Sequence, residues 1–185
     1  MKWMIASDIH GSAYYCRQLL NAYHREQADR LLLLGDLLYH GPRNDLPEEY
    51  DPKQVIKLLN RSKQNILSVR GNCDTEVDQM VLQFPILADY CAIADGNTLI
   101  YATHGHNFNE QNLPPLHKGD ILLHGHTHVP KCVTHDTYTY LNPGSVSIPK
   151  EGSWHGYMIF EHDRFLWKTL TSEIKMEFTN GNPPL

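Results

Sequence analysis

The stretch Arg30-Leu31-Leu32-Leu33-Leu34-Gly35-Asp36-Leu37 places four consecutive leucines directly before a glycine and an aspartate. Four leucines in a row follow neither the helical nor the alternating period, so they predict a strand that is buried on both faces. Open α/β sheets bind their ligands at the carboxyl ends of such strands. A Gly-Asp pair by itself is most often an ordinary turn. A carboxylate beside so apolar a strand nevertheless needs a partner, because an isolated buried charge is costly.

Length and composition narrow the class of protein. The chain has 185 residues, enough for a single domain over residues 1–185 with its own hydrophobic core. Its formal charge of −5 argues against an extended nucleic-acid surface. No run of about 18 apolar residues is present, so no membrane contact is expected. The first residues do not resemble a signal peptide, and the 4 cysteines stand far apart, which favours reduced thiols in the cytoplasm.

The first half of the chain predicts the order β-α-β-α-β. A strand over Trp3 to Ala6 leads into a helix capped by Ser12, and Asp51-Pro52 opens a second helix after the leucine strand. A third buried strand is expected over Asn65 to Val69. The helices then serve as crossovers between parallel strands, which brings the carboxyl ends of the strands to one edge of the sheet.

The second half predicts short strands joined by turns. Residues 95–97, Asp-Gly-Asn, indicate a hairpin. The strands are expected at Cys91 to Ala94, Thr98 to Thr103, Ile121 to His124, Cys132 to His135, Tyr138 to Leu141, Tyr157 to Phe160 and Phe165 to Leu170. Two sheets packed face to face, with helices outside, accommodate both halves. The tail from Asn180 to Leu185 is expected to be loosely held.

Polar motifs recur where the predicted strands end. Asp8 and His10 stand two residues apart, and in an extended chain such residues point the same way. His126 and His128 repeat that spacing. Each motif alone has an ordinary explanation, such as a capping aspartate, a turn asparagine or a surface histidine. Together the candidate metal ligands are Asp8, His10, Asp36, Asn72, His104, His126 and His128.

The donor set indicates a divalent metal centre. Oxygen and imidazole donors without thiolate suit manganese, iron, cobalt or zinc, whereas calcium and magnesium prefer more oxygen. Seven donors exceed the need of one ion and fit two ions that share Asp36 as a bridge. Two divalent cations, two carboxylates and one hydroxide leave a charge of about +1, which attracts an anionic ester. The sequence therefore predicts hydrolysis of phosphate esters.

The motifs closely resemble those of the calcineurin-like metallophosphoesterase superfamily. In chain order they are Asp8-x-His10, Gly35-Asp36, Gly71-Asn72-x-Asp74, His104 and Gly125-His126-x-His128. The Gly-Asn-Cys-Asp form of the third motif, Asn142-Pro143-Gly144-Ser145 and the stretch from His40 to Asn44 resemble the small bacterial YfcE-type phosphodiesterases within that superfamily.

The resemblance implies an α/β fold, a four-layer αββα sandwich of two mixed β-sheets flanked by helices. It also implies a division of the ligands between two ions. The first ion would take Asp8, His10, Asp36 and His128. The second ion would take Asp36, Asn72, His104 and His126. A hydroxide that bridges both ions would be the nucleophile of an in-line attack, and manganese is the expected metal, with zinc, iron and cobalt as alternatives.

One position departs from many phosphatases of the superfamily. Cys73 stands where those enzymes have a histidine that is thought to protonate the leaving group, although the small diesterases share the cysteine. A thiol is a weak hydrogen-bonding group with a reference pKa of about 8.5, so it does not reproduce an imidazole. Asp74 loses the histidine it would orient and is expected to cap the following helix.

Other residues are candidates for substrate contact. Arg43, in the loop after the leucine strand, is suited to a fork on phosphate oxygens. His40 and His106 are possible proton donors, and His106 is favoured; a solvent-facing loop residue is the alternative for each. The remaining histidines, expected on the surface, are His24, His117, His124, His135, His155 and His162.

The sequence thus predicts a two-metal phosphodiesterase that acts on a small phosphodiester, in which Asp36, Asn72, Cys73, His106 and Arg43 are the candidate catalytic residues. Two alternatives stay open. One is a phosphomonoesterase or phosphoprotein phosphatase, which the cysteine at position 73 disfavours. The other is a metal-binding interaction scaffold, for which eroded ligands would be expected. A homo-oligomer is possible by the same resemblance.

Overall fold

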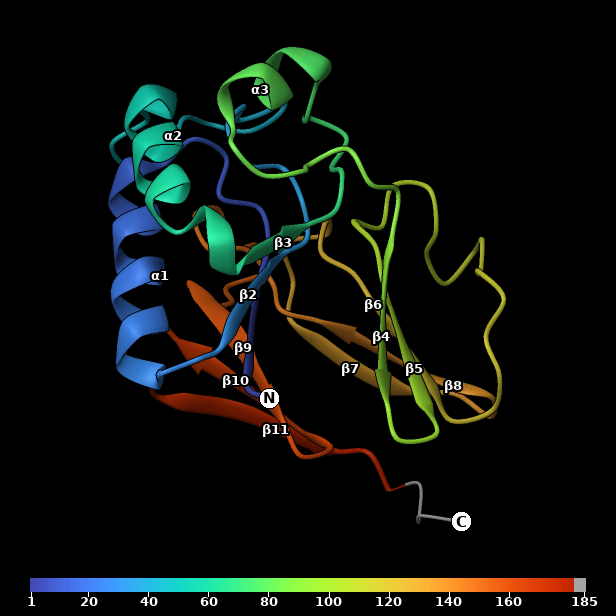
Figure 1. The fold of residues 1–185 in the computed structure, drawn as a ribbon. Helices are drawn as coiled ribbons and strands as arrows, with labels where there is room; N and C mark the ends of the chain where they lie inside the picture. Colours follow the sequence, from blue (N-terminus) through green and yellow to red (C-terminus); the bar gives the residue numbers. More distant parts are fainter. Residues whose placement is uncertain (182–185) are drawn as a thin grey trace.

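The structure is a computed structural model, and it describes residues 1–181. Two mixed sheets face each other, with helices over the outer face of the first sheet (Figure 1). The first sheet has the strand order β11-β10-β9-β1-β2-β3. Its strands are β1 (Trp3–Ala6), β2 (Arg30–Leu33), β3 (Ile66–Ser68), β9 (Gly156–Glu161), β10 (Arg164–Thr169) and β11 (Ile174–Thr179).

The second sheet has the order β4-β5-β6-β8-β7, in which β5, β6 and β8 are parallel. Its strands are β4 (Cys91–Asp95), β5 (Thr98–Ala102), β6 (Asp120–Leu123), β7 (Lys131–Thr134) and β8 (Tyr138–Asn142). The helices are α1 (Ala13–Glu26), α2 (Pro52–Arg61) and α3 (Glu76–Val81), with a short 3₁₀ turn at Lys63–Asn65.

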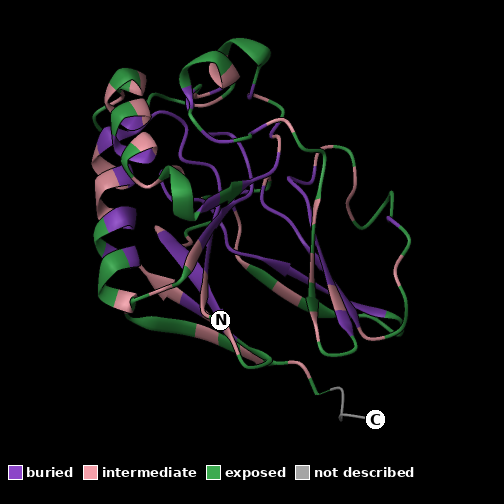
Figure 2. Ribbon diagram, in the orientation of Figure 1, coloured by how far each residue is buried: buried purple, intermediate pink, exposed green. Residues whose placement is uncertain are grey.

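The leucine run has the two-faced burial that the sequence predicts. Leu31 and Leu33 pack with the side chains of α1 and α2, whereas Leu32 and Leu34 lie in the core between the two sheets. All four are fully buried, and Figure 2 shows buried segments concentrated between the layers. The strand therefore joins both cores, and its carboxyl end carries Asp36.

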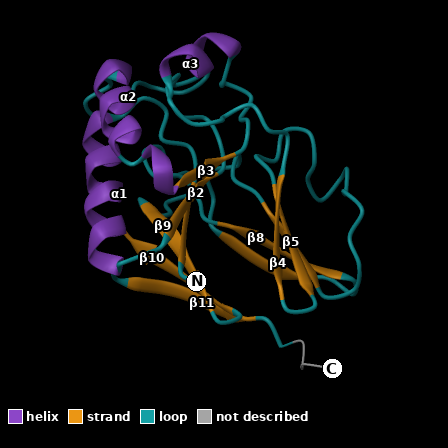
Figure 3. Cartoon of the chain, viewed as in Figure 1, coloured by secondary structure: helices purple, strands orange, loops and turns teal. Residues whose placement is uncertain are grey.

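The predicted sandwich of two mixed sheets is confirmed, and its outermost layer on the second sheet is a loop. Among residues 1–181, the helices gather on the side of the first sheet and above it (Figure 3). The outer face of the second sheet buries Tyr101, Leu122 and Tyr140, against which Phe108 and Leu116 pack. The segment between β5 and β6 thus covers this face with two apolar anchors.

The structure corrects two local expectations and adds one strand. β3 is an edge strand, and Leu67, which lies beside Leu32 in the register, is 43% exposed because no further strand covers it. β11 was not predicted, although it pairs along β10. Asn180 is held, since its backbone N–H donates to Asp163 O over 2.8 Å. Residues 182–185 of the predicted loose tail lie outside the described residues.

Glu26, the last residue of α1, fastens that helix to the first sheet. Its carboxylate accepts hydrogen bonds from Lys168 Nζ at 2.7 Å and from Tyr157 Oη at 2.8 Å. Burial raises the pKa of Glu26, but the hydrogen bonds from Lys168 and Tyr157 outweigh burial and hold the pKa below its ordinary value. A carboxyl whose pKa is lowered by folding stabilises the protein above its unfolded-state pKa, and this contribution is lost as the pH falls.

Glu26→Gln is therefore expected to lower the free energy of unfolding by about 1–2 kcal/mol at pH 7, because charge-assisted hydrogen bonds become neutral ones. The deficit should begin to shrink below the unfolded-state pKa of about 4.3, where the unfolded chain takes up the proton first, and should disappear once the pH has fallen through the lower native pKa. Urea unfolding at pH 7 and pH 3 measures both values. Glu177→Gln, in the exposed pair with Arg164, is the control and should change less. If Glu26→Gln lowered the free energy of unfolding equally at both pH values, the loss would come from altered packing rather than from the missing charge.

Candidate metal centre

Seven polar side chains meet at the carboxyl ends of five strands. Asp8 and His10 follow β1, Asp36 follows β2, and Asn72 follows β3. From the second sheet, His104 follows β5, and the pair His126 and His128 follows β6. Because β1, β2 and β3 are parallel, and β5 and β6 are parallel, their ends lie at the same edge of each sheet. All seven sequence-predicted metal donors are thereby brought together.

The backbone that carries these donors differs from the expected extended chain. Five of them have positive φ: Asp8 60°, His10 49°, Asp36 56°, His126 65° and His128 62°. This left-handed region is uncommon for residues other than glycine, and it concentrates at functional sites. The alternation of side chains along an extended strand therefore does not explain why these side chains lie together. Tight left-handed turns after each strand aim them at a common point.

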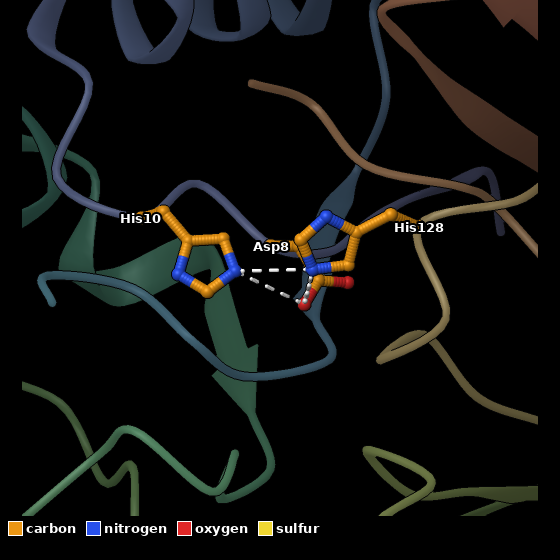
Figure 4. A group of neighbouring side chains, drawn as sticks. All are labelled: Asp8, His10 and His128. Carbon is orange, nitrogen blue, oxygen red and sulfur yellow. Dashed lines mark hydrogen bonds and ion pairs between the residues drawn. The ribbon is translucent and has the colours of Figure 1, made fainter. Parts of the chain in front are cut away.

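The first donor cluster comprises Asp8, His10 and His128 (Figure 4). His128 Nε2 lies 3.3 Å from Asp8 Oδ1, and His10 Nε2 lies 3.6 Å from the same oxygen. The two Nε2 atoms are 3.2 Å apart. All three side chains are nearly inaccessible to solvent.

The second donor cluster comprises His104, Asn72 and His126. His104 Nε2 lies 3.0 Å from Asn72 Oδ1 and 3.1 Å from His126 Nδ1. Asp36 stands between the clusters: its Oδ2 is 3.7 Å from His10 Nε2 and 3.5 Å from His104 Nε2. One carboxylate oxygen thus faces both groups of donors.

Backbone carbonyls fix the orientation of three imidazoles. The Nδ1 atoms of His10, His104 and His128 each lie 2.7 Å from a carbonyl oxygen, those of Tyr39, Leu34 and Ile148 respectively. A carbonyl oxygen only accepts, so each Nδ1 carries the proton and each Nε2 presents its lone pair to the centre. This arrangement is typical of metal-bound histidine.

The arrangement of donor atoms in the first cluster is suited to binding a cation. The neutral rings of His10 and His128 would direct two lone pairs at each other across 3.2 Å. Asp8 Oδ1 is buried and, among the described residues, has no hydrogen-bond donor. Burial lowers the pKa of His10, but the Asp8 carboxylate outweighs it and raises that pKa above its ordinary value. A divalent cation between nitrogen and oxygen donors would resolve the lone-pair repulsion and the unpaired carboxylate together.

Asp74 has a different role from the predicted helix cap. Its Oδ2 accepts the backbone N–H groups of Asp36 and Gly71, both over 2.8 Å, and its Oδ1 accepts that of Leu37 over 2.9 Å. Thr75 caps α3 instead, in a capping box with Asp78. Asp74 therefore ties the turn after β2 to the turn after β3 beneath the centre.

The Asn142–Ser145 stretch supports the centre from behind. Asn142 Nδ2 donates to Gly125 O over 2.9 Å and to Thr127 Oγ1 over 3.1 Å, on either side of His126. The hydroxyl of Ser145 donates to Asp8 O over 2.9 Å, and Ser147 does the same over 2.9 Å. These buried contacts hold the turns that carry His126 and Asp8.

A pocket of about 440 Å³ opens onto the centre. It is lined by His10, Asp36, Gly41, Pro42, Arg43, Asn44, Asn72, Cys73, His126, Thr127, His128 and Lys150. Arg43 and Cys73, both predicted from the sequence, line it. Lys150 was missed, because it follows no motif and the chain distance from the other residues hides its position.

His106 and His40 do not line that pocket. His106 is half-buried beside a smaller pocket of about 250 Å³, with its ring centroid 5.4 Å from that of His104. His40 lies between the rings of Tyr39 and Tyr50. His124 is buried rather than exposed as expected, and its ring stacks on Tyr140 with centroids 4.3 Å apart.

Cys73 contacts the centre mainly through its backbone. Its N–H donates to Asp36 Oδ1 over 2.8 Å, while its Sγ accepts a hydrogen bond from Asn72 Nδ2 over 3.2 Å. The sulfur also lies near donor atoms of His10 and Asp36. Burial, followed by the charge of Asp36, raises the pKa of the thiol to about 12.

Cys73→Ala is expected to change kcat/KM for a diester by less than about threefold, because the backbone hydrogen bond to Asp36 survives the loss of the sulfur. Steady-state rates and metal content of the purified protein measure this. Cys91→Ala, which alters a half-buried thiol in β4, is the control. Abolished activity with metals retained would give the thiol a part in the reaction, whereas loss of metal would make the sulfur a ligand.

Known proteins resemble this chain in both sequence and structure. Residues 1–164 match the family model of the calcineurin-like phosphoesterase superfamily domain. The chain is 45% identical over 163 residues to phosphodiesterase YfcE of Escherichia coli K12, covering 88% of this chain and 89% of that protein. The solved structure of YfcE, a phosphoesterase from E. coli, superposes with a TM-score of 0.94 at 42% identity, covering 98% of this chain and 100% of that one.

A more distant structure shares the fold alone. Wild-type Vps29 complexed with Zn²⁺, from Entamoeba histolytica, superposes with a TM-score of 0.59 at 19% identity, over 98% of this chain and 100% of that one.

Proposed function

The chain belongs to the calcineurin-like phosphoesterase superfamily, and we propose that it hydrolyses phosphate diesters with two divalent metal ions. The position of Asp36 carries this proposal. Its Oδ2 faces donors on both sides, at 3.7 Å and 3.5 Å. In this assignment Asp8, His10 and His128 would hold the first ion and Asn72, His104 and His126 would hold the second, with Asp36 available to both.

When bound, two such ions stabilise negative charge on the phosphate group and lower the pKa of a water molecule. The chain's own residues supply the positions. The carbonyls of Tyr39, Leu34 and Ile148 keep three Nε2 lone pairs turned inward. Arg43 lines the same pocket, where its guanidinium is available to an anionic group of the substrate.

A diester is favoured over a monoester. The closely similar protein from E. coli is named a phosphodiesterase. The pocket wall at position 73 is a thiol rather than an imidazole, so the residue that protonates leaving groups in many phosphatases is missing. His106 is an alternative proton donor that stands outside the main pocket.

The other proposals concern the metal, the compartment and the scaffold alternative. Manganese suits a mixed nitrogen and oxygen donor set.

The free state of all 4 cysteines supports a location in the reducing cytoplasm. Among the described residues, no helix is long and apolar enough to cross a bilayer. A non-catalytic scaffold is disfavoured, because seven intact donors converge on one centre.

The test is hydrolysis of bis(p-nitrophenyl) phosphate against p-nitrophenyl phosphate by metal-stripped protein to which manganese, zinc or magnesium is restored. Diester hydrolysis that depends on a transition metal would support the proposal. Faster hydrolysis of the monoester would favour the phosphatase. Failure to hydrolyse either ester, with two metals bound, would contradict a general phosphodiesterase.

A further inference from the structure

Two cationic side chains line the main pocket and come from loops far apart in the sequence. Arg43 comes from the loop between β2 and α2, and Lys150 from the loop between β8 and β9. Both are exposed, and among residues 1–181 neither side chain forms an ion pair or a hydrogen bond. Of the residues that line the pocket, Asp36 is the single carboxylate. The mouth of the pocket is therefore a region of uncompensated positive charge.

The backbone beneath each cation is braced. Lys150 donates its N–H to the carbonyl of His128 over 3.2 Å, and its own carbonyl accepts from Ser153 Oγ over 2.7 Å. Asn44 Nδ2 donates to His40 O over 2.8 Å, which closes the turn that carries Arg43. Each of these two pocket-lining side chains is thus carried by a backbone that hydrogen bonds hold in place.

Charge counting indicates what these cations could bind. Two divalent ions and the carboxylates of Asp8 and Asp36 sum to +2, which an attacking hydroxide and the single charge of a diester cancel. Arg43 and Lys150 then leave about +2 at the pocket mouth. A phosphate monoester carries a charge between about −1.5 and −2 at pH 7 and accepts hydrogen bonds through three oxygens.

We propose that Arg43 and Lys150 bind a second phosphate group of the substrate, so that the enzyme prefers phosphodiesters that also carry a terminal phosphate monoester. Thr127 lies in the same pocket, where its hydroxyl oxygen accepts a hydrogen bond from Asn142 Nδ2. This inference rests on the proposed function and adds a substrate class to it.

A matched pair of substrates tests the preference. Thymidine 5′-(p-nitrophenyl phosphate) is a diester, and its 3′-phosphorylated form differs only by a phosphate monoester. At constant ionic strength, kcat/KM should be at least about tenfold higher for the 3′-phosphorylated compound, the effect of one or two charge-assisted hydrogen bonds. Equal values for the two substrates would overturn the proposal while leaving the phosphodiesterase intact.

Variants assign the effect to the two cations. Lys150→Gln and Arg43→Gln should each reduce the preference ratio about tenfold, and Lys150→Arg should retain most of it. Lys118→Gln, an exposed lysine before the start of β6 and so at the opposite end of that strand, should not alter the ratio. An equal loss on both substrates in Lys150→Gln would place the lysine on the scissile phosphate and contradict the proposal.

Binding without catalysis separates this inference from the proposed function. Calorimetry on metal-free protein should give tighter binding of thymidine 3′,5′-bisphosphate than of thymidine 5′-phosphate, with the difference reduced in Lys150→Gln and in high salt. If the protein hydrolyses neither ester but retains this difference in affinity, the proposed phosphodiesterase activity is refuted and the binding site for a second phosphate is supported. A protein that hydrolyses both without the difference would refute the anion site.

Discussion

Asp36→Asn is expected to abolish nearly all diester hydrolysis and to weaken both metal sites at once. The amide preserves the volume of the carboxylate and can still accept from the Cys73 backbone through Oδ1. In that orientation it places an NH₂ group where Oδ2 faces His10 and His104. Loss of a bridging charge between two divalent ions should reduce kcat/KM by about a thousandfold or more.

Metal stoichiometry makes this prediction specific. Asp8 Oδ1 lies beside His10 and His128, and we assign Asp8 to the first ion alone, so Asp8→Asn should leave one ion bound while Asp36→Asn weakens both. Thermal unfolding with and without manganese gives a second readout, because a ligand stabilises the folded state according to its affinity. Two ions retained by active Asp36→Asn protein would remove Asp36 from the bridge.

Metal-free Asp36→Asn protein should be at least as stable as the native protein. Asp36 is 2% exposed, and in the absence of metal its carboxylate contacts the Cys73 N–H and two imidazoles. A buried carboxylate without a close cation is costly, so replacing it by a neutral amide should not destabilise the metal-free protein. A large loss of stability in the metal-free variant would instead make the carboxylate a structural element of the turn.

The parts of the fold that could be predicted are those governed by local pattern. The four leucines and the Ser12 and Asp51 caps depend on burial and on hydrogen bonds within a few residues, and all appear in the structure. β11 also has an alternating pattern, Ile174, Met176 and Phe178, and was overlooked because charged residues stand between them. The edge position of β3 depends on the order of the strands in the sheet, which cannot be read from a local sequence pattern.

The donors of the centre were predictable from residue type, whereas their geometry was not. Left-handed φ values at Asp8, His10 and Asp36 arise because tertiary contacts impose them, as in the hydrogen bond from His10 N to Asp36 O over 2.9 Å. Lys150 reaches the pocket only through the fold. Asp74 was identified as a motif residue, but two of its three backbone partners, Leu37 and Asp36, lie 37 and 38 residues earlier in the chain.

Asp74→Asn is the second substitution expected to have a large effect, although its side chain is not a proposed ligand. At the cap of a helix, asparagine replaces aspartate with little loss. Here the two carboxylate oxygens accept from three backbone N–H groups, so an amide must direct its NH₂ toward at least one donor. The buried mismatch should lower the free energy of unfolding by about 2–3 kcal/mol.

Activity should fall further than stability alone requires, because the same N–H groups belong to Asp36 and to Gly71, which precedes Asn72. The gap between these two turns is small: a Cβ on Gly71 would stand 2.1 Å from Asp36 Oδ1. Displacement of either turn would misplace the Asp36 carboxylate relative to His10 and His104. We therefore expect kcat/KM of Asp74→Asn to fall by about a hundredfold under conditions where the variant is fully folded, with weakened metal binding.

Thr75→Ala is the matched control for Asp74→Asn, since it removes the observed cap of α3. It should lower the free energy of unfolding by about 1 kcal/mol and leave kcat/KM unchanged. Chemical unfolding and steady-state kinetics on both variants separate the two roles. If Asp74→Asn behaved like Thr75→Ala, Asp74 would be a stabilising residue only. A fall in kcat/KM confined to Asp74→Asn would instead show that the position of the Asp36 carboxylate depends on the three backbone hydrogen bonds to Asp74.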